Sequence, residues 1–292
     1  MSPATAFKDF VTEQAPLAGR TWLAVGGPAA YFAEPTSREE LVSLVEWCAA
    51  EEVPVKVLGG GSNVLVRDAG FPGVVISLAA PAFAEIGGSS GTLTAGGGAA
   101  LASVVSESVR LGLSGLDALV GIPGTLGGAL HSNAGSKGGD IGQWTCEATV
   151  LTRAGEVLTR RRDDLIFAYR QSSLDELVIL DARFELEEED PDLLTKRMQK
   201  HWIVKKASQP NTGQQTACIF RNPRGMSAGM LIDQAGLKGE AVGGAEVSRD
   251  HANYFVTTDG ATSDDVQKLI DLVRSRVAER LGVELETELE IW

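Results

Sequence analysis

The chain has 292 residues, of which 43% are hydrophobic and 22% are charged, which is enough apolar material for more than one packed domain of an ordinary globular protein. Its formal net charge of −13 argues against non-specific binding to nucleic acid and to anionic membrane surfaces. An anionic ligand would therefore have to be bound by local basic groups.

The cysteines, the first residues and the longest uncharged run indicate the compartment. Cys48, Cys146 and Cys218 are widely spaced and form no C-x-x-C pair, which is typical of a reduced protein rather than of a disulfide or zinc scaffold. Residues 1–10 lack the apolar core of a secretory signal, and the glycine-rich run 118–136 is unsuited to a membrane span. The three histidines lack metal-ligand spacing. We expect a cytoplasmic protein without a metal.

The first half of the chain alternates strands with helices. Apolar spacing after a capping-box-like sequence predicts a helix over 41–50, and short apolar runs predict strands over 55–58 and 74–78. A strand over 92–95 and a helix over 101–111 follow. Strands are then predicted over 148–152, 157–159 and 178–187.

The second half begins after the acidic run 187–191, which we interpret as a solvated hinge and domain boundary. Helices are predicted over 192–201, 228–234 and 266–281, and strands over 241–247 and 254–257. A last strand over 284–291 would place its four glutamates on one face. These limits divide the chain into domains 1–79, 80–189 and 190–282, with the last strand (283–292) joining the second domain.

Two glycine-rich loops are the strongest local signals. Residues 59–63 read Gly-Gly-Gly-Ser-Asn between apolar runs, and residues 121–128 read Gly-Ile-Pro-Gly-Thr-Leu-Gly-Gly, with Ser-Asn-Ala-Gly at 132–135. Such loops let backbone N–H groups approach an anion closely, which suits a pyrophosphate. Neither loop has the spacing of a P-loop or of a Rossmann fingerprint.

Five motifs together carry a family resemblance. They lie in order at residues 59–66, 121–135, 167–172 (Phe-Ala-Tyr-Arg-Gln-Ser), 220–223 (Phe-Arg-Asn-Pro) and 247–253 (Val-Ser-Arg-Asp-His-Ala-Asn). From about Leu23 to its last residue, the chain resembles the UDP-N-acetylenolpyruvoylglucosamine reductases of peptidoglycan precursor synthesis. The resemblance implies a mixed α/β (α+β) fold: a two-part FAD-binding domain of the vanillyl-alcohol-oxidase type and a C-terminal substrate-binding domain.

The resemblance also implies the chemistry and the cofactors. The chain would bind FAD non-covalently, take hydride from NADPH and reduce the enolpyruvyl ether of UDP-N-acetylglucosamine to UDP-N-acetylmuramate, and we expect a monomer. The implied FAD-binding residues are Gly59, Gly60, Gly61, Ser62, Asn63, Gly121, Ile122, Pro123, Gly124, Gly127, Gly128, Ser132, Asn133, Ala134 and Gly135.

Three residues match the family's catalytic positions. Arg170 would pair with the substrate carboxylate through its planar guanidinium. Cys218 stands where the family has a proton-donor serine; a thiol with an ordinary pKa of about 8.5 is a stronger acid than a hydroxyl and remains largely protonated at neutral pH. Glu288 fits the catalytic glutamate best, with Glu286 as the alternative.

The expected substrate contacts come from five residues: Tyr169, Lys206, Arg221, Asn222 and Lys238. Residue 170 is followed almost directly by the strand over 178–187, so the chain resembles the short subtype, which lacks a tyrosine-bearing insertion over the substrate. Nothing in the sequence shows what replaces that lid.

Two rival functions remain open from the sequence. One is another FAD oxidoreductase of the same binding fold that acts on a sugar or a hydroxy acid. No histidine precedes His131, which argues against the early covalent flavin tether of many such enzymes. The other is a flavin-binding protein that has lost catalysis, although a degenerate site would have no reason to keep both Arg170 and Glu288.

Overall fold

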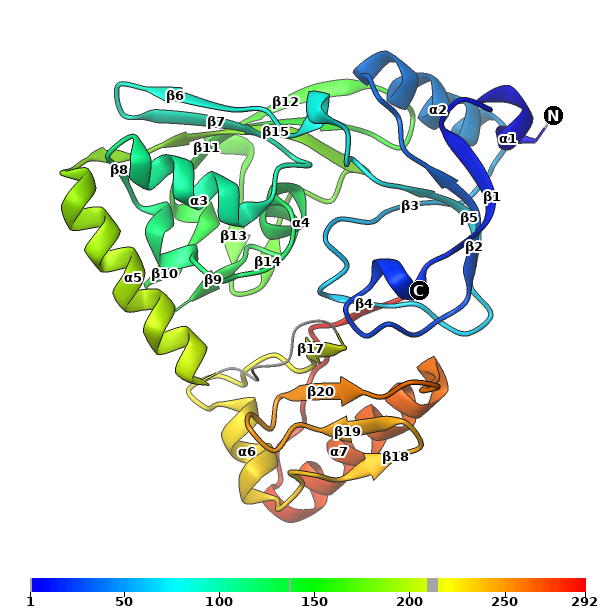
Figure 1. The fold of residues 1–292 in the computed structure, drawn as a ribbon, viewed down its shortest axis with the longest axis vertical. Helices are drawn as coiled ribbons and strands as arrows, with labels where there is room; N and C mark the ends of the chain where they lie inside the picture. Colours follow the sequence, from blue (N-terminus) through cyan, green and yellow to red (C-terminus); the bar gives the residue numbers. More distant parts are fainter. Residues whose placement is uncertain (1, 137, 209–214) are drawn as a thin grey trace. The chain divides into compact units, whose positions relative to one another are not determined.

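The computed structural model describes residues 2–136, 138–208 and 215–292, and the chain divides into two compact units (Figure 1). Unit 1 comprises Met1–Gln14, Tyr31–Gly60 and Pro72–Lys205. Unit 2 comprises Ala15–Ala30, Gly61–Phe71 and Lys206–Trp292. Within the described residues, no helix is both long enough and apolar enough to cross a membrane.

The first sheet is small and carries one long helix. Its strand order is β1-β2-β5-β3, and the core that includes Leu41, Leu44 and Val45 of α2 lies in unit 1. Ser37 caps α2 by accepting the N–H of Glu40, whose carboxylate in turn accepts the N–H of Thr36 at 2.6 Å. The elements are α1 (Pro3–Ala6), β1 (Val11–Pro16), β2 (Pro28–Ala33), α2 (Arg38–Ala50), β3 (Val55–Val57) and β5 (Phe71–Ile76).

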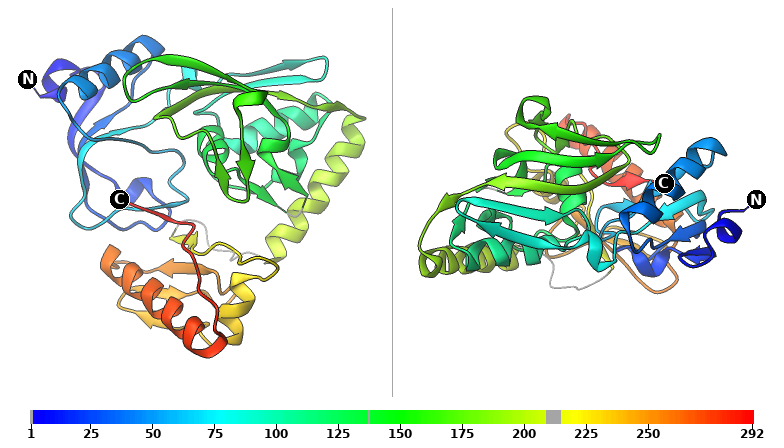
Figure 2. Two further views of the ribbon diagram at one scale, coloured as in Figure 1. Left: turned by 180° about the vertical axis from the view of Figure 1, so that it is seen from behind. Right: turned by 90° about the horizontal axis from the view of Figure 1, so that it is seen from above.

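The second sheet of unit 1 has five strands in the antiparallel order β12-β11-β15-β7-β6, and helices α3 and α4 pack against it (Figure 2). Its core is built from the apolar faces of these strands and helices. The elements are β6 (Ile86–Ser89), β7 (Thr92–Gly96), α3 (Leu101–Arg110), α4 (Leu126–His131), β11 (Thr145–Leu151), β12 (Val157–Arg161) and β15 (Val178–Glu185).

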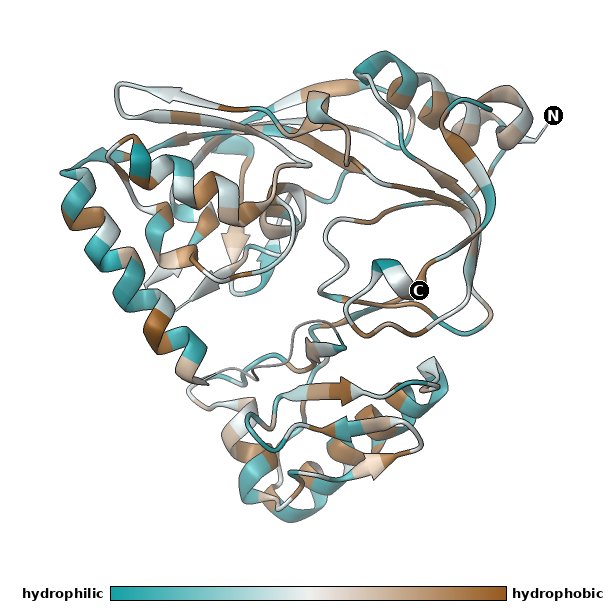
Figure 3. Cartoon of the chain, in the orientation of Figure 1, coloured by the Kyte–Doolittle hydropathy of each residue, from teal (hydrophilic) through white to brown (hydrophobic). Residues whose placement is uncertain are grey.

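Helix α5 (Pro191–Ser208) is longer than predicted, and Figure 3 shows polar and apolar residues mixed along it. Beyond the predicted end at residue 201, Trp202 to Val204 are apolar yet exposed, so this part of the helix has no amphipathic pattern. The acidic run before α5 contains the exposed strand β16 (Glu187–Glu188), which pairs with β8 (Leu113–Ser114). Unit 1 continues past this run to Lys205, and the predicted domain boundary in the run stays a prediction.

Unit 2 is a four-stranded antiparallel sheet, β17-β20-β19-β18, with helix α7 on one face (Figures 1 and 2). Thr262 and Asp265 form a capping box at the start of α7. The apolar face of α7 fills the core of the unit. The elements are β17 (Thr216–Cys218), α6 (Ala228–Gln234), β18 (Ala241–Val242), β19 (Ala245–Val247), β20 (Tyr254–Thr257) and α7 (Ser263–Leu281).

Two predicted strands differ from the structure. Residues 241–247 form a hairpin, not one strand, because Gly243 adopts φ +53° and turns the chain. Of residues 284–291, only β21 (Glu290–Ile291) is a strand, and it pairs with β4 (Val64–Leu65), which lies in the predicted first domain rather than in the second. The period-two pattern persists nevertheless, because Leu285 and Leu289 are buried. The three-domain division remains a prediction.

The remaining elements are short: β9 (Gly135–Ser136), β10 (Gly139–Asp140), β13 (Phe167–Ala168), β14 (Gln171–Ser172), and five 3-10 turns at Ala18–Arg20, Pro81–Phe83, Leu116–Leu119, Ile141–Gln143 and Arg162–Asp164. They matter because β13 and β14 form the hairpin that carries Tyr169 and Arg170 at its tip.

Candidate functional site

In unit 1 the two glycine loops lie against each other. A Cβ on Gly60 would be 2.6 Å from the Cα of Gly124, and a Cβ on Gly59 would be 2.7 Å from Oγ1 of Thr125. Side chains are excluded at this contact, so the loops meet backbone to backbone. Glycine loops of this kind can present main-chain N–H groups to a pyrophosphate, and we call the contact between them the cradle. Its role in binding FAD stays a prediction.

Backbone hydrogen bonds hold the second loop in place. The carbonyl of Gly124 accepts the N–H of Leu101 at 3.0 Å, and Gly127 donates its N–H to Gly97 at 2.8 Å. Thr125 caps the short helix α4 by accepting the N–H of Gly128. Between these anchors, Ile122 donates its N–H to Leu119 and packs on the core, and Pro123 follows it in the loop.

The stretch 132–135 closes the loop region and supports the Tyr169–Arg170 hairpin. The buried side chain of Asn133 donates to the carbonyl of Ala168 at 2.8 Å and accepts the N–H of Gly142 at 3.1 Å. Ser132 donates to the carbonyl of Gly128, and the buried Ala134 donates its N–H to Ala129. The amide of Asn133 thus positions neighbouring backbone.

Arg170 occupies the tip of the β13–β14 hairpin in the left-handed region, with φ +56°. Few residues other than glycine adopt this conformation, and where they do the cost is often retained for function. Its Nη1 donates to the carbonyl of Gly135 at 3.1 Å, and its guanidinium lies 5.4 Å from the centre of the exposed Tyr169 ring. The structure therefore brings Arg170 to the end of the second glycine loop.

A second cation near Arg170 was not predicted. Lys205 of α5 donates to the carbonyl of Val120 at 3.3 Å, directly before the second glycine loop, and the Trp202 ring covers Gly121. Burial, together with the charge of Arg170, lowers the pKa of Lys205 to about 8. The sequence prediction named the neighbouring Lys206 instead, but Lys206 is exposed in the structure. Nothing in the local sequence distinguishes the two lysines.

In unit 2 the segments that carry Cys218 and Glu288 are hydrogen-bonded neighbours. Glu288 donates its N–H to the carbonyl of Ile219 at 2.8 Å, and Arg221 donates its N–H to Glu286 at 2.9 Å. Cys218 is half-buried at the end of β17. The two predicted catalytic residues of this unit therefore lie on adjoining segments, although they are 70 positions apart in the sequence.

The side chain of Asn253 fixes the backbone that follows Cys218. Its Oδ1 accepts the N–H of Phe220 at 3.0 Å, and its Nδ2 donates to the carbonyl of Phe220 at 2.7 Å and to Sγ of Cys218 at 3.3 Å. Asn253 belongs to a motif noted in the sequence, but only the antiparallel pairing of β17 with β20 reveals its contact with the thiol.

The predicted phosphate-binding residues also lie in unit 2. Nε of Arg221 is buried and has no hydrogen-bond partner among the described residues. Such a group is expected where a bound anion would accept its hydrogen bond. Oδ1 of Asn222 accepts the N–H of Ala228 at 2.9 Å. Lys238 pairs with Asp233 at 2.9 Å, and burial and the charge of Lys238 lower the pKa of His251.

The rest of the first glycine loop belongs to unit 2. Gly61 accepts the N–H of Trp22 at 2.9 Å, and Ser62 is half-buried beside it. Nδ2 of Asn63 donates to the carbonyl of Glu288 at 3.1 Å. A predicted cofactor residue is therefore bonded to the segment of a predicted catalytic residue.

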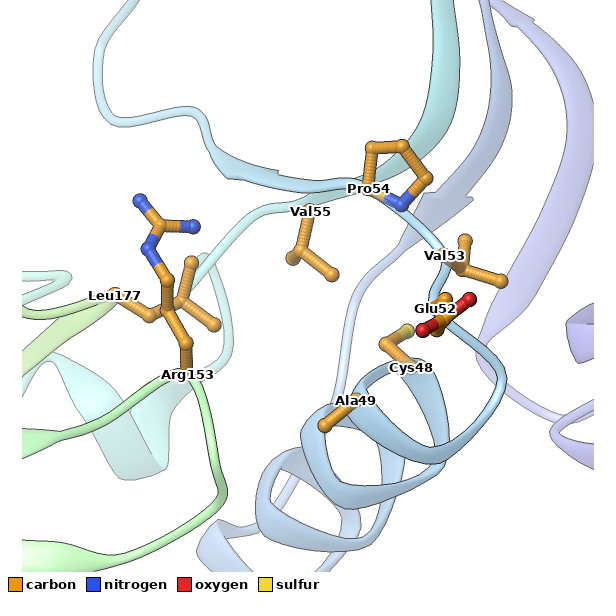
Figure 4. Close-up of a pocket in the computed structure, with 8 residues that line it drawn as sticks. All are labelled: Cys48, Ala49, Glu52, Val53, Pro54, Val55, Arg153 and Leu177. Atoms are coloured by element: carbon orange, nitrogen blue, oxygen red, sulfur yellow. The ribbon is translucent and has the colours of Figure 1, made fainter.

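A separate cavity of about 200 Å³ lies in unit 1, away from the predicted site residues (Figure 4). Burial raises the pKa of the Cys48 thiol in its wall to about 11, so this thiol remains protonated and is a poor nucleophile. The lining residues are Cys48, Ala49, Glu52, Val53, Pro54, Val55, Arg153 and Leu177. Across the described part of the chain, no cluster of three or more histidine, cysteine or acidic residues is arranged to hold a metal ion.

Comparison with known proteins identifies the family. A model described as an FAD binding domain matches residues 29–160, and one described as the C-terminal domain of UDP-N-acetylenolpyruvoylglucosamine reductase matches residues 209–292. The chain is 39% identical over 282 residues to UDP-N-acetylenolpyruvoylglucosamine reductase of Rhodopirellula baltica, covering 97% of this chain and 92% of the relative. It is 40% identical over 279 residues to UDP-N-acetylenolpyruvoylglucosamine reductase 2 of Symbiobacterium thermophilum, covering 95% and 90%.

Comparison with a solved structure leads to the same family as comparison with the sequences. The crystal structure of UDP-N-acetylenolpyruvylglucosamine reductase from Thermus caldophilus matches with a TM-score of 0.82 at 37% identity, covering 97% of this chain and 100% of that one. The fold is thus the predicted FAD-binding domain followed by the C-terminal domain of these reductases. The chain belongs to the UDP-N-acetylenolpyruvoylglucosamine reductase family.

Proposed function

We propose that this chain uses NADPH to reduce the enolpyruvyl ether of UDP-N-acetylglucosamine to UDP-N-acetylmuramate, with non-covalently bound FAD, as a cytoplasmic enzyme of peptidoglycan precursor synthesis. Family membership supports the substrate and the reaction class. The backbone contact at Gly60 and Gly124 supports FAD, because it excludes side chains and allows main-chain N–H groups to approach a bound pyrophosphate. When bound, FAD relays hydride from NADPH to the methylene carbon of the substrate.

Arg170 is proposed to bind the substrate carboxylate. Adding hydride to the methylene carbon leaves an enolate conjugated to that carboxylate, so negative charge increases as the reaction proceeds. A guanidinium pairs with a carboxylate through two parallel N–H donors and keeps its charge. Lys205, whose charge acts on Arg170, adds a second positive group to this part of unit 1.

Cys218 is proposed to protonate the enolate. The Sγ–H bond breaks, the enolate electron pair forms the new C–H bond, and the resulting thiolate regains a proton from solvent. Glu288 is the proposed partner in this step, and its backbone bond to Ile219 places it on the segment beside Cys218. Arg221, Asn222, Tyr169, Lys206 and Lys238 are proposed to bind the rest of the substrate, with Arg221 first because its buried Nε has no partner among the described residues.

The main support for this proposal is that the segments of Cys218 and Glu288 are hydrogen-bonded neighbours. The sequence predicted a role for each residue but could not predict that their segments are adjacent. The test is turnover of the UDP-enolpyruvyl sugar with NADPH by wild type, Cys218→Ser and Cys218→Ala, with the saturated ether detected by mass spectrometry. We expect product from wild type and from Cys218→Ser, and about 10²–10⁴-fold less from Cys218→Ala. Wild-type turnover by Cys218→Ala would contradict the proposed role of the thiol.

A further inference from the structure

The contact between Asn253 and Cys218 has a consequence for proton delivery. The backbone N–H of Phe220 can only donate, so the atom of Asn253 that accepts it is the carbonyl oxygen. The other end of the amide is therefore the NH₂ group, which donates to the Phe220 carbonyl and to the Cys218 sulfur. Because both ends of the Asn253 side chain are hydrogen-bonded, its orientation is fixed.

The surroundings hold Asn253 firmly. Its side chain is buried, and its backbone N–H donates to Nδ1 of His251 at 3.2 Å. Its carbonyl accepts the N–H of Ile219 at 3.0 Å. The side chain and the carbonyl of Asn253 are thus bonded to the segment that carries Cys218, and a buried side chain held this way is suited to orient a neighbouring group.

We propose that Asn253 is a positioning residue for the proton donor: its NH₂ group directs the S–H of Cys218 away from itself and stabilises the thiolate left by proton transfer. This rests on the proposed role of Cys218. An N–H donor to sulfur occupies one lone pair, so the S–H proton must point elsewhere. A hydrogen bond to the charged form favours that form, so the bond strengthens as the proton leaves.

The measurement is the pH profile of iodoacetamide alkylation, mapped by mass spectrometry on the FAD-loaded full chain. Asn253→Asp keeps the acceptor for Phe220, removes the donors to Sγ and to the Phe220 carbonyl, and adds a negative charge that also disfavours the thiolate; Asn253→Ser removes the donors without adding the charge. We expect the alkylation midpoint of Cys218 to rise by about 1–2 pH units, since hydrogen bonds to charged groups have this strength. Cys146, whose thiol donates to the carbonyl of Arg183 in unit 1, is the internal control and should not change.

Two further variants keep the test decisive. Asn253→Ser shortens the side chain so that it cannot reach Sγ, and it replaces Asn253→Asp if that variant loses FAD. The titratable and charged residues on the segments around Cys218 are intact in both variants, among them Tyr254, His251, Arg221, Glu286 and Glu288. An unchanged Cys218 midpoint in a variant that retains FAD would overturn the proposal.

Single-turnover kinetics separate this inference from the proposed function. In the Asn253 variants we expect reduction by NADPH to be unchanged, the substrate half-reaction to slow about 10–100-fold and its solvent isotope effect to grow. In a Cys218→Ala background, the Asn253 substitution should add less than about 2-fold, because coupled residues are not additive. If Cys218→Ala is slow but Asn253→Asp has the wild-type rate and isotope effect, the positioning role of Asn253 is contradicted while the proposed role of Cys218 stands. If Cys218→Ala is fast, the proposed proton donor fails.

Discussion

At the scale of single residues, the candidate site is built from groups whose orientation the backbone dictates. Arg170 has a left-handed φ at a hairpin tip, and Asn133 and Asn253 use their amides to hold neighbouring backbone. Such residues cannot relax independently of the segments they hold.

Arg170→Lys and Glu288→Gln test which step depends on these side chains. We expect each to slow the substrate half-reaction by at least about 10²-fold while reduction by NADPH changes little, because both groups are proposed to act only on the developing enolate. Anaerobic stopped-flow measures the two halves separately. Equal losses in both halves would indicate a structural role, and an effect of Glu286→Gln alone would move the assignment to that residue.

The lowered pKa of Lys205 gives a second test. Burial and the charge of Arg170 lower it to about 8, so lysine labelling against pH should show a midpoint near this value. In Arg170→Gln we expect the midpoint to move up. Because the folded state binds fewer protons than the unfolded state between pH 8 and the ordinary lysine pKa of about 10.4, stability should rise with pH across this window. A wild-type midpoint near 10.4 would contradict the burial of this group.

At the scale of elements, the contact between the two glycine loops leaves no space for a side chain. Gly60→Ala would place a methyl group 2.6 Å from Gly124 backbone, which must then move. We expect loss of most bound FAD, measured by absorbance after gel filtration. The matched control is Gly87→Ala in β6, where a Cβ has nothing within 4 Å, and it should retain FAD. Full FAD content in Gly60→Ala would show that the loops do not form the cradle.

Helix α5 is fixed to unit 1 through Arg197, whose guanidinium contacts Asp117 at 2.7 Å, Glu189 at 3.0 Å and Ser114 at 2.8 Å. Arg197→Met should cost about 2 kcal/mol in chemical denaturation, less than a fully buried pair because this arginine is partly exposed. The exposed pair Arg110–Glu107 provides the control, and Arg110→Met should cost much less than Arg197→Met. Similar costs for both would refute the anchoring role.

Asp117 makes this anchor sensitive to acid. Burial alone would raise the pKa of Asp117, but the hydrogen bond and charge of Arg197 outweigh it and lower the pKa. The carboxylate therefore adds stability above its unfolded pKa of about 3.9, and this is lost as the pH falls through the lower folded value. Denaturation against pH should show a shallower loss below pH 4 in Asp117→Asn than in wild type; parallel curves would contradict the assignment.

The sequence predicted elements well where local signals decide the structure. Helix α6 and strand β20 have the predicted limits, because capping and apolar patterns mark their ends. The sequence prediction was wrong at residues 241–247, where a glycine turn interrupts an apolar run. It was also wrong at residues 284–291, where the length of the strand depends on which residues find a pairing partner. The contacts of Lys205 and Asn253 depend on tertiary packing, so no spacing rule could reveal them.

At the scale of the whole molecule, the family resemblance and the two glycine loops lead to one cofactor prediction. The purified chain should carry one FAD that acid releases, because no histidine precedes His131 and the Nδ1 of His131 is hydrogen-bonded to the carbonyl of Leu174. Acid precipitation followed by spectroscopy of the supernatant checks this. Flavin that stays with the precipitated protein would contradict it.

The most direct test of the central claim is anaerobic stopped-flow of the FAD-loaded chain, reduced with NADPH and then mixed with the UDP-enolpyruvyl sugar. The proposed function predicts that flavin absorbance is bleached by NADPH and returns on addition of this substrate without oxygen, with the saturated ether as product. A matched run with UDP-N-acetylglucosamine, which lacks the enolpyruvyl group, should leave the flavin reduced. Failure of the enolpyruvyl substrate to restore the absorbance would contradict the proposed function.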